Sequence, residues 1–425
     1  MTKFSKNTNA LHVGHDANSV QGSIAVPIYQ NTAYAFKNTD HAAKVFALKE
    51  FDFLYTRLNN PTNDVLEKRL ASIEGGIAAN VFASGTSANL TTFLTLLKNG
   101  DHIVSGSSLY GGTFNMLNIT LPRLGIDTTF ANPDNINNFE NAIQDNTKCI
   151  FVESLGNPRL DVLDLEKIAK IAQKHKIPFI VDNTVATPAL LNPIEYGANI
   201  VTHSLTKYID GTGSSLGGVV IDGGNFDWSS GKFPEFTGQS KAYHGINYHE
   251  NFGNLAFFVK LRIEGLRDIG ASLSPQNAFQ ILQGLRTLDL RIKKHSKNAL
   301  ELAKWLEDRD EVLWVNYPGL KNSKYYNLAQ KYLPQAQSGI LTFGVKGGYE
   351  ASKKVTDATK LFSLVANFGD SKSLIIHPAS TTHQQLSTEE KLSAGVSEDL
   401  IRLSVGLEDV NDLKTDLLQA FNSLK

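Results

Sequence analysis

One lysine, Lys207, stands among small hydroxyl residues in the segment HSLTKYIDGTGSSLGG. Ser204 precedes it by three residues, Thr206 precedes it directly, and a run of glycines follows. Most lysines are exposed and chemically inert. A lysine flanked by hydroxyls instead of other charges, at the end of a strand-like run, is typical of one that forms a Schiff base with an aldehyde. Ser204 and Thr206 would then donate to a phosphate on the same ligand.

A second segment that suits phosphate is ASGTSAN, in which Gly85, Thr86 and Ser87 separate a strand-like run from a helix. The free N–H groups in the first turn of a helix bind anions. Taken alone, Thr86 or Ser87 is better explained as an ordinary helix N-cap, because such caps are common. The segment is a candidate phosphate site in combination with Lys207.

Acidic and amide side chains follow other predicted strands. Asp182 ends FIVD, whereas Glu153 and Asn157 follow CIFV. Ligands of open α/β sheets bind at the carboxyl ends of the strands, so these groups are expected near one pocket. A carboxylate opposite a lysine suits a pyridinium nitrogen, although Asp182 alone is equally well explained as a turn cap. Lysine, carboxylate and phosphate cradle together indicate pyridoxal phosphate.

The elements that must position these groups alternate between strand and helix. We expect helices over residues 112–124, 135–145 and 164–176, between the strands DHIVSG, IDTTFA, CIFVES, PFIVDN, NIVTHS and GGVVID. Continuous apolar strands separated by helices predict an α/β fold with a mostly parallel sheet covered by helices. In an earlier helix, Leu66, Leu70 and Ile73 share one face and Gly75 supplies the stop.

The pattern changes after about residue 250. Helices are predicted over 251–268 and 276–307, and the strands VLWVNYPG, GILTFGV, SLIIHP and IRLSVG indicate a smaller C-terminal α+β domain.

Several motifs are excluded by their context. Gly211, Gly213 and Gly217 lack the G-x-G-x-x-G spacing and run into a strand, GTSAN lacks the second glycine of G-x-S-x-G, and HENFG is not H-E-x-x-H.

Composition excludes other classes of protein. The chain has 425 residues with 41 Lys and Arg against 42 Asp and Glu, which gives no electrostatic case for nucleic acid or an anionic membrane. The single cysteine, Cys149, excludes an intramolecular disulfide and a cysteine metal cluster. No apolar run reaches the roughly 18 residues of a membrane span, so we expect a cytoplasmic protein.

Together these motifs resemble the cysteine and methionine metabolism family of pyridoxal-phosphate enzymes. VDNT followed by HSLTKYIDG carries the resemblance, and AVPIYQNTAYAF, YTRLNNPT, ASGTSAN, LYGGT, NPRLDVLDL, HPASTTH and IRLSVGLED follow the expected order over essentially the whole chain. FDFLYTRLNNPT, ESLGNPRLDVLDL and YHGINY are closer to the branch that acts on O-acetylhomoserine. Many lyases of the family have Gly-Met where this chain has Gly85-Thr86, a departure that points away from the lyase branch.

The resemblance implies a role for each candidate residue. Lys207, Tyr110 and Asp182 are the expected catalytic residues: the lysine bonded to the cofactor, the ring stacked on it and the partner of its pyridine nitrogen. The other implied cofactor contacts are Gly85, Thr86, Ser204 and Thr206 at the phosphate, Asn157 at the phenolic oxygen, Thr184, and Tyr55 with Arg57 from a neighbouring subunit. Arg402, helped by the backbone of Ser373 and Leu374, resembles the clamp for the substrate carboxylate.

The implied fold is that of fold type I pyridoxal-phosphate transferases. It has an arm at residues 1–60 that contributes to a neighbouring subunit, a cofactor-binding domain at 61–255 and a small domain at 256–425. The implied reaction is γ-replacement, which converts O-acetyl-L-homoserine and sulfide to L-homocysteine and acetate in methionine and cysteine biosynthesis. We expect a homotetramer with active sites shared between two subunits, and no metal, nucleic acid or membrane partner.

Two alternatives stay open at this point. A γ-lyase of the same family would cleave cystathionine or methionine. A cofactor-binding regulator without catalysis is the alternative from another class, because a fold does not determine function.

Overall fold

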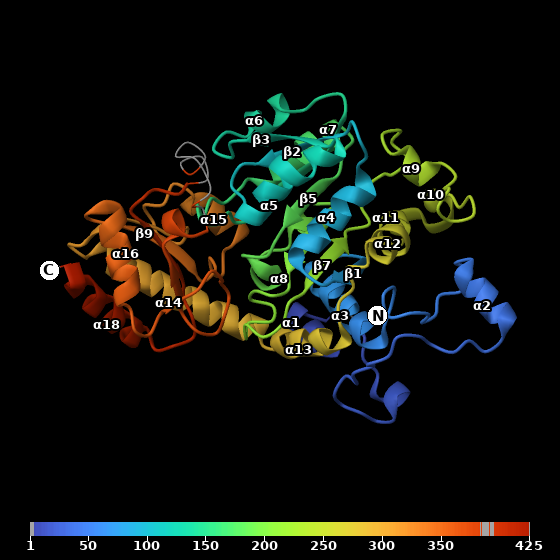
Figure 1. Ribbon diagram of the computed structural model, residues 1–425, viewed down its shortest axis with the longest axis horizontal. Coiled ribbons are helices and arrows are strands. Elements are labelled where there is room, and N and C mark those ends of the chain that lie inside the picture. Colours follow the sequence, from blue (N-terminus) through green and yellow to red (C-terminus); the bar gives the residue numbers. More distant parts are fainter. Residues whose placement is uncertain (1–3, 383, 385–390, 392–394, 425) are drawn as a thin grey trace. The chain divides into compact units, whose positions relative to one another are not determined.

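The computed structural model describes residues 4–382, 384, 391 and 395–424, which fold into two compact units (Figure 1). The first unit comprises Met1–Leu97, Asn199–Thr206 and Ser214–Arg286; the second comprises Lys98–Ala198, Lys207–Gly213 and Thr287–Lys425. The segment that carries Lys207 is thus divided directly after Thr206. The domain boundaries expected at residues 60 and 255 stay a prediction, and the HPASTTH motif ends at His383, outside the described residues.

In the first unit, strand β7 (Gly218–Asp222) pairs with both β1 (Ala78–Phe82) and β6 (Ile200–Ser204). Both pairings are antiparallel, which differs from the direction expected from alternating strands and helices. The physical reason is the connection from β6 to β7, which contains no helix to cross over the sheet, so the chain turns back beside the strand it has just left. The segments of this unit run from dark to light blue and from green to golden yellow in Figure 1.

Helix α3 (Pro61–Glu74) begins and ends where its sequence predicts. The side chain of Asn60 accepts a hydrogen bond from the N–H of Thr62, Pro61 occupies the first turn, and Gly75 ends the helix in the left-handed conformation with φ of 87°. The predicted apolar face of Leu66, Leu70 and Ile73 is buried. The other helices of the unit are α1 (Lys6–His12), α2 (Thr39–Phe46), α4 (Gly85–Leu96), α9 (Pro234–Thr237), α10 (Tyr248–Phe252), α11 (Ala256–Lys260), α12 (Arg267–Ile269) and α13 (Pro275–Leu285).

The second unit contains four parallel strands in the order β5–β4–β2–β3 within the described residues. They are β2 (His102–Gly106), β3 (Asp127–Ala131), β4 (Thr147–Glu153) and β5 (Phe179–Asp182), each within a predicted strand or within two residues of one. The associated helices are α5 (Gly111–Asn115), α6 (Asn137–Asn141), α7 (Leu165–Lys174) and α8 (Thr187–Leu190). The helix expected over 112–124 continues from α5 as a π-helix at Met116–Thr120 and a 3₁₀ turn at Pro122–Leu124.

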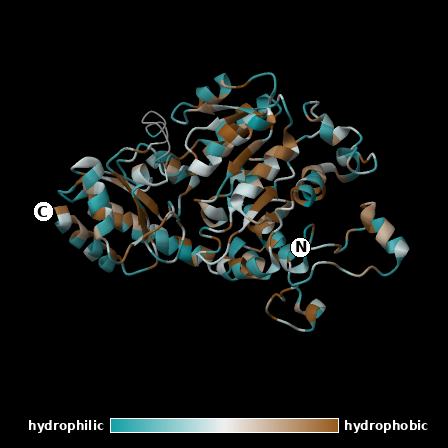
Figure 2. Ribbon diagram, in the orientation of Figure 1, coloured by the Kyte–Doolittle hydropathy of each residue, from teal (hydrophilic) through white to brown (hydrophobic). Residues whose placement is uncertain are grey.

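A second sheet in this unit has the order β10–β11–β12–β9–β8. Its strands are β8 (Val312–Asn316), β9 (Ile340–Val345), β10 (Ser363–Leu364), β11 (Leu374–Ile376) and β12 (Leu400–Ser404), and its helices are α14 (Leu288–Glu307), α15 (Tyr326–Tyr332), α16 (Gly348–Ala358) and α18 (Val410–Phe421). Phe343, Leu403 and Phe421 lie in its buried core. Figure 2 shows hydrophobic colour along the strands, and every residue of the central strands β9 and β12 is buried.

The predicted helix over 276–307 is broken. It forms α13 and α14, separated by Arg286 and Thr287 at a boundary between the two units. The predicted helix over 251–268 is also divided, here within the first unit, into α10, α11 and a π-helix at Leu261–Leu266. None of the helices in the described part of the chain combines the length and the apolar character needed to cross a bilayer.

One buried carboxylate joins helix α18 to the segment directly before strand β10 in the second unit. Asp416 in α18 accepts the N–H groups of Lys360 and Leu361 at 2.8 Å and that of Phe362 at 3.0 Å. Asp416→Ala leaves these three donors without an acceptor, and we expect it to cost about 3 kcal/mol of folding free energy. The melting temperature should fall clearly, whereas Asp412→Asn, an exposed position on the same helix, should leave it nearly unchanged. Equal melting temperatures for the two variants would contradict this role.

Candidate functional site

In the first unit, the N-terminus of helix α4 lies against the end of strand β6. A Cβ atom on Gly85 would lie 2.7 Å from Cβ and 2.8 Å from Cα of Ser204, so this approach requires glycine. At the start of β7, a Cβ atom on Gly218 would lie 2.1 Å from the carbonyl oxygen of Ser84. Bare backbone on both sides therefore brings two of the predicted phosphate contacts, Gly85 and Ser204, together.

The residue that caps α4 is Ser84, whereas the local pattern suggested Thr86 or Ser87. Ser84 Oγ accepts the N–H of Ser87 at 3.1 Å, and Ser87 Oγ accepts the N–H of Ser84 at 3.1 Å. The N–H groups of Gly85 and Thr86 belong to the first turn, which offers them no intrahelical acceptor. With the positive end of the helix dipole, this turn suits an anion such as a phosphate.

Lys207 lies half-buried in the second unit. Its Nζ donates to Oδ1 of Asn367 and lies 5.1 Å from the ring centroid of Phe368. Burial, and next the positive charge of Arg402, lower the pKa of Lys207 to about 8. Because the neutral amine is the form that attacks an aldehyde, this environment prepares Lys207 for the chemistry expected of it.

The backbone around Lys207 is held from two sides. Gly369, with φ of 80°, packs so closely that its Cβ would lie 2.6 Å from the backbone nitrogen of Tyr208. The guanidinium of Arg291 donates to the carbonyls of Tyr208 at 2.7 Å and Ile209 at 3.2 Å. These contacts fix the turn from which the amine projects.

Arg402, on β12, is the buried cation beside this amine. Its Nη1 donates to Oδ1 of Asn157 at 3.2 Å and its Nη2 donates to the carbonyl of Asn367 at 2.9 Å. Burial lowers the pKa of Arg402 to about 10, so the guanidinium stays charged at neutral pH. A charged guanidinium group that is oriented by two asparagine residues is suited to bind a carboxylate through two parallel hydrogen bonds.

The expected helpers of Arg402, the backbones of Ser373 and Leu374, make other contacts in this structure, and their role at a substrate carboxylate stays a prediction. The N–H and hydroxyl of Ser373 are hydrogen-bonded to Glu408 at 2.6 Å and 2.8 Å, and Ser373 is fully buried. Leu374 lies in β11, buried and paired with Ser404. Asn367 is the residue that contacts both Arg402 and Lys207, and sequence reasoning missed it. The signal available was an amide and an aromatic residue directly before a glycine, in ANFGD.

The acidic candidates lie at the ends of neighbouring strands. Oδ1 of Asp182 accepts the N–H of Thr184 at 3.0 Å and its hydroxyl at 2.5 Å. Glu153 is the register partner of Asp182 and accepts the N–H of Tyr110 at 2.6 Å. The side chain of Tyr110 is 53% exposed, and a Cβ on Gly112 would lie 2.5 Å from its ring. Tyr110 therefore rests on bare backbone and leaves much of its ring accessible for stacking.

Tyr55 and Arg57 belong to the first unit and are both exposed. The guanidinium carbon of Arg57 lies 5.3 Å from the ring centroid of Tyr55, within cation–π range. Thr206, at the end of its segment of the same unit, accepts the N–H of Gly217 through its hydroxyl at 3.1 Å. Their expected roles at the phosphate stay predictions.

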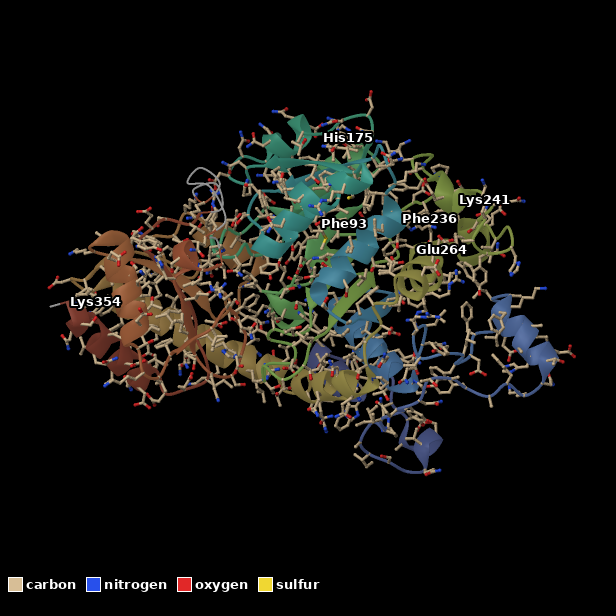
Figure 3. All side chains as sticks on the ribbon, in the orientation of Figure 1. Phe93, His175, Phe236, Lys241, Glu264 and Lys354 are labelled. Carbon is tan, nitrogen blue, oxygen red and sulfur yellow. The ribbon has the colours of Figure 1, made fainter. Side chains whose placement is uncertain are left out.

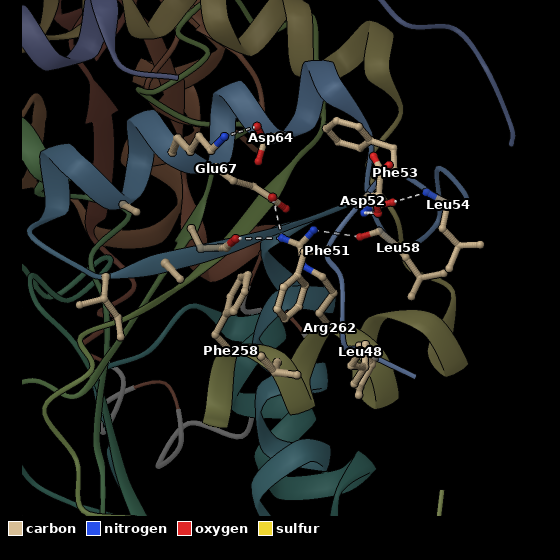
Figure 4. A pocket seen from close by; sticks show the side chains of 18 of the residues that line it. Leu48, Phe51, Asp52, Phe53, Leu54, Leu58, Asp64, Glu67, Phe258 and Arg262 are labelled. Atoms are coloured by element: carbon tan, nitrogen blue, oxygen red, sulfur yellow. Dashed lines mark hydrogen bonds and ion pairs between the residues drawn. The ribbon is translucent and has the colours of Figure 1, made fainter. Parts of the chain in front are cut away.

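A cavity of about 780 Å³ in the first unit is a separate feature (Figure 4). Arg262 donates to Glu67 at 2.6 Å and to the carbonyl of Leu58 at 3.0 Å, and its guanidinium lies 4.9 Å from the ring of Phe258. None of the predicted site residues is among those that line the cavity within the described part of the chain. The charges of Arg262 and Glu67 are paired with each other, and the cavity is separate from the lysine and the strand-end carboxylates described above.

Comparisons with known proteins agree with this chemistry. Residues 7–422 match the family model described as Cys/Met metabolism PLP-dependent enzyme. The chain belongs to this family. It is 50% identical to an O-acetyl-L-homoserine sulfhydrylase of Leptospira meyeri over 99% of this chain and 97% of the relative, and 49% identical to a homocysteine synthase of Schizosaccharomyces pombe over 97% of each.

The chain is also similar to a solved structure from Campylobacter jejuni, with a TM-score of 0.96 and 46% sequence identity. The match covers 99% of this chain and 100% of the Campylobacter jejuni chain. It is described as an O-acetylhomoserine (thiol)-lyase with N'-pyridoxyl-lysine-5'-monophosphate. The predicted α/β fold, with a mostly parallel sheet and a second smaller sheet, is confirmed. Dependence on pyridoxal phosphate is likewise confirmed by family membership.

The lowered pKa of Lys207 makes cofactor capture depend on pH. In the chain freed of cofactor, the rate of pyridoxal phosphate attachment should rise between pH 7 and 9 with a midpoint near the pKa of about 8, because only the neutral amine reacts. Arg402→Gln removes a neighbouring positive charge and should move the midpoint to higher pH. Stopped-flow absorbance would measure both. A wild-type midpoint at the ordinary lysine value, or no displacement in the variant, would contradict this account of the amine.

Proposed function

We propose that the chain catalyses γ-replacement of O-acetyl-L-homoserine by sulfide, giving L-homocysteine and acetate. The observation that carries the proposal is a half-buried amine with a lowered pKa, Lys207, linked through Asn367 to a buried carboxylate clamp, Arg402. The names of relatives near 50% identity over nearly the full chain support the substrate and the product. A γ-lyase acting on cystathionine or methionine is not favoured by these relatives.

The residues present fit pyridoxal phosphate. The first turn of α4 with Ser204, where a glycine Cβ would collide, suits the phosphate, and Thr206 is joined to Lys207 by a peptide bond. Lys207 is the amine for the aldehyde, and Asp182 suits the ring nitrogen. When bound, the cofactor supplies an electron-withdrawing ring that acidifies the substrate's Cα.

The chain's own groups perform the remaining tasks. Arg402, oriented by Asn157 and Asn367, receives the substrate carboxylate. Lys207 accepts the Cα proton, because its pKa of about 8 leaves a useful fraction neutral at physiological pH. The accessible ring of Tyr110 covers one face of the bound cofactor and orients it.

We also propose that the enzyme is a cytoplasmic homotetramer whose active sites are shared between two subunits, with residues 1–60 as the shared arm. Large apolar side chains are exposed along this arm, including Phe4 at 62%, Ile24 at 83% and Phe51 at 71%. Such exposure is costly in water and is typical of a surface covered by a partner. Tyr55 and Arg57, also exposed on the arm, would reach the partner's cofactor phosphate.

A substrate panel tests the proposed reaction. With sulfide, O-acetyl-L-homoserine should give a thiol product faster than O-succinylhomoserine, O-phosphohomoserine or O-acetylserine, and methionine or cystathionine alone should give little 2-oxobutyrate. Lys207→Ala should lose the visible absorbance of the bound cofactor and nearly all turnover, since it lacks the amine, while keeping the wild-type circular dichroism spectrum. Wild-type turnover in this variant, or faster 2-oxobutyrate release than thiol formation, would exclude the proposal.

Shared sites predict complementation between two inactive variants. Lys207→Ala and Arg57→Ala damage the same site from opposite subunits, so a hybrid dimer contains one site with both defects and one intact site. Mixing equal amounts under subunit exchange should restore about a quarter of wild-type activity, since half the dimers are hybrids. Activity that equals the mean of the two separate variants would show that Arg57 acts within its own subunit or elsewhere.

A further inference from the structure

Two carboxyl groups end adjacent parallel strands in the second unit. Glu153 is the last residue of β4, Asp182 is the last residue of β5, and the two are register partners. Side chains of register partners lie on the same face of a sheet. Two ionised carboxyl groups in this arrangement repel each other, so their protonation states are coupled.

The hydrogen bonds distinguish the two groups. The carboxylate of Asp182 accepts two donors from Thr184, its N–H at 3.0 Å and its hydroxyl at 2.5 Å. Donors of this kind stabilise the ionised form. Glu153 accepts the N–H of Tyr110, and it is more deeply buried, at 6% exposure, than the half-buried Asp182. The negative charge is therefore better accommodated on Asp182.

The surroundings of Glu153 add to this difference. Burial, and next the charge of Asp182, raise the pKa of Glu153 well above its usual range, and Asp161 contributes in the same direction. The N–H of Tyr110 opposes the shift in the pKa of Glu153 but has a smaller effect than burial or the charge of Asp182. Asp161 is itself fully buried, accepts the hydroxyl of Ser108 at 2.5 Å and has a raised pKa because of burial.

We propose that Glu153 is held as the neutral acid beside an ionised Asp182, and that in this state it is a positioning residue for Tyr110. The inference rests on the proposed function, in which Asp182 faces the ring nitrogen of the cofactor and Tyr110 stacks on its ring. A proton on Glu153 leaves Asp182 as the single charge of the pair. The same carboxyl fixes the backbone of Tyr110 where α5 begins, while Gly112 supports the ring.

Infrared spectroscopy tests the proton directly. At neutral pH, the infrared spectrum of the wild type minus that of Glu153→Gln should show the carbonyl band of a protonated carboxylic acid. We expect this band whether or not the cofactor is bound. The melting temperature of the cofactor-free wild type should also fall relative to Glu153→Gln as pH rises. Because the pKa of Glu153 is higher in the folded than in the unfolded state, its contribution to stability is fully present below the unfolded-state pKa. This contribution is lost as pH rises towards the folded-state pKa, and the unfolding equilibrium constant increases by up to about tenfold per pH unit.

Cofactor affinity tests the positioning role. Titration of the cofactor-free chain with pyridoxal phosphate should show weaker binding in Glu153→Ala, since the N–H of Tyr110 loses its acceptor, and recovery of most of the affinity in Glu153→Gln, which keeps a neutral acceptor. Asp222→Asn is a matched control. Asp222 is also buried, has a pKa raised to about 7, and accepts the N–H groups of Gly224 and Phe258, none of which belongs to the site.

The outcomes separate the two proposals. Absence of the carboxylic acid band, with parallel melting curves for wild type and Glu153→Gln, would overturn the protonated Glu153. An equal loss of affinity in Glu153→Ala and Asp222→Asn would overturn the positioning role. If Glu153→Gln fails to fold, the pH titration of the band in the wild type decides the protonation state. If the wild type binds no pyridoxal phosphate, the proposed function fails, and the infrared band still tests Glu153.

Discussion

The constraint on which the second unit's chemistry depends is the partial removal of the Lys207 amine from water. An ammonium group loses hydration when it is buried, and a neighbouring guanidinium makes its charge still less favourable. Asn367 supplies one acceptor and the face of Phe368 supplies a weak attraction, so these two uncharged groups hold the amine in place and do not by themselves force it to stay protonated. The result is a lysine that stays ordered and yet loses its proton near neutral pH.

This environment requires the loop from residue 365 to 369 to lie against the backbone of Lys207, and glycine makes that contact. A side chain at Gly369 would collide with the nitrogen of Tyr208, and one at Gly211 would lie 2.0 Å from the guanidinium of Arg291 that clamps the same turn. The first unit uses the same device, in which Gly85 and Gly218 let a helix terminus reach the end of a strand. The glycines after Lys207 are thus explained by close packing, and flexibility is not needed to account for them.

Most of the features that could be predicted from the sequence are local ones, such as helix ends, helix faces and strands. The stop at Gly75, the apolar face of α3 and most strands were confirmed because each depends on a few adjacent residues. The break between α13 and α14 depends on how distant segments pack, which local periodicity does not record, whereas the direction of β7 follows from the short connection without a helix that precedes it. Asn367 was missed for a related reason: strand β10 has two residues, too few to show alternation, so the ANFGD motif alone did not place the following loop beside Arg402.

The two cations and the two acids at the site of the second unit differ in how readily each gives up or takes up a proton. Lys207 and Arg402 both have pKa values lowered by burial, but only that of the lysine falls close to neutral pH. Arg402 thus remains a permanent charge for a carboxylate while Lys207 exchanges its proton. The acids show the opposite asymmetry, since burial places the proton on Glu153 and the hydroxyl and N–H of Thr184 stabilise a charge on Asp182. In each pair one member is fixed by its surroundings, so the proton transfers that the chemistry requires are concentrated on Lys207.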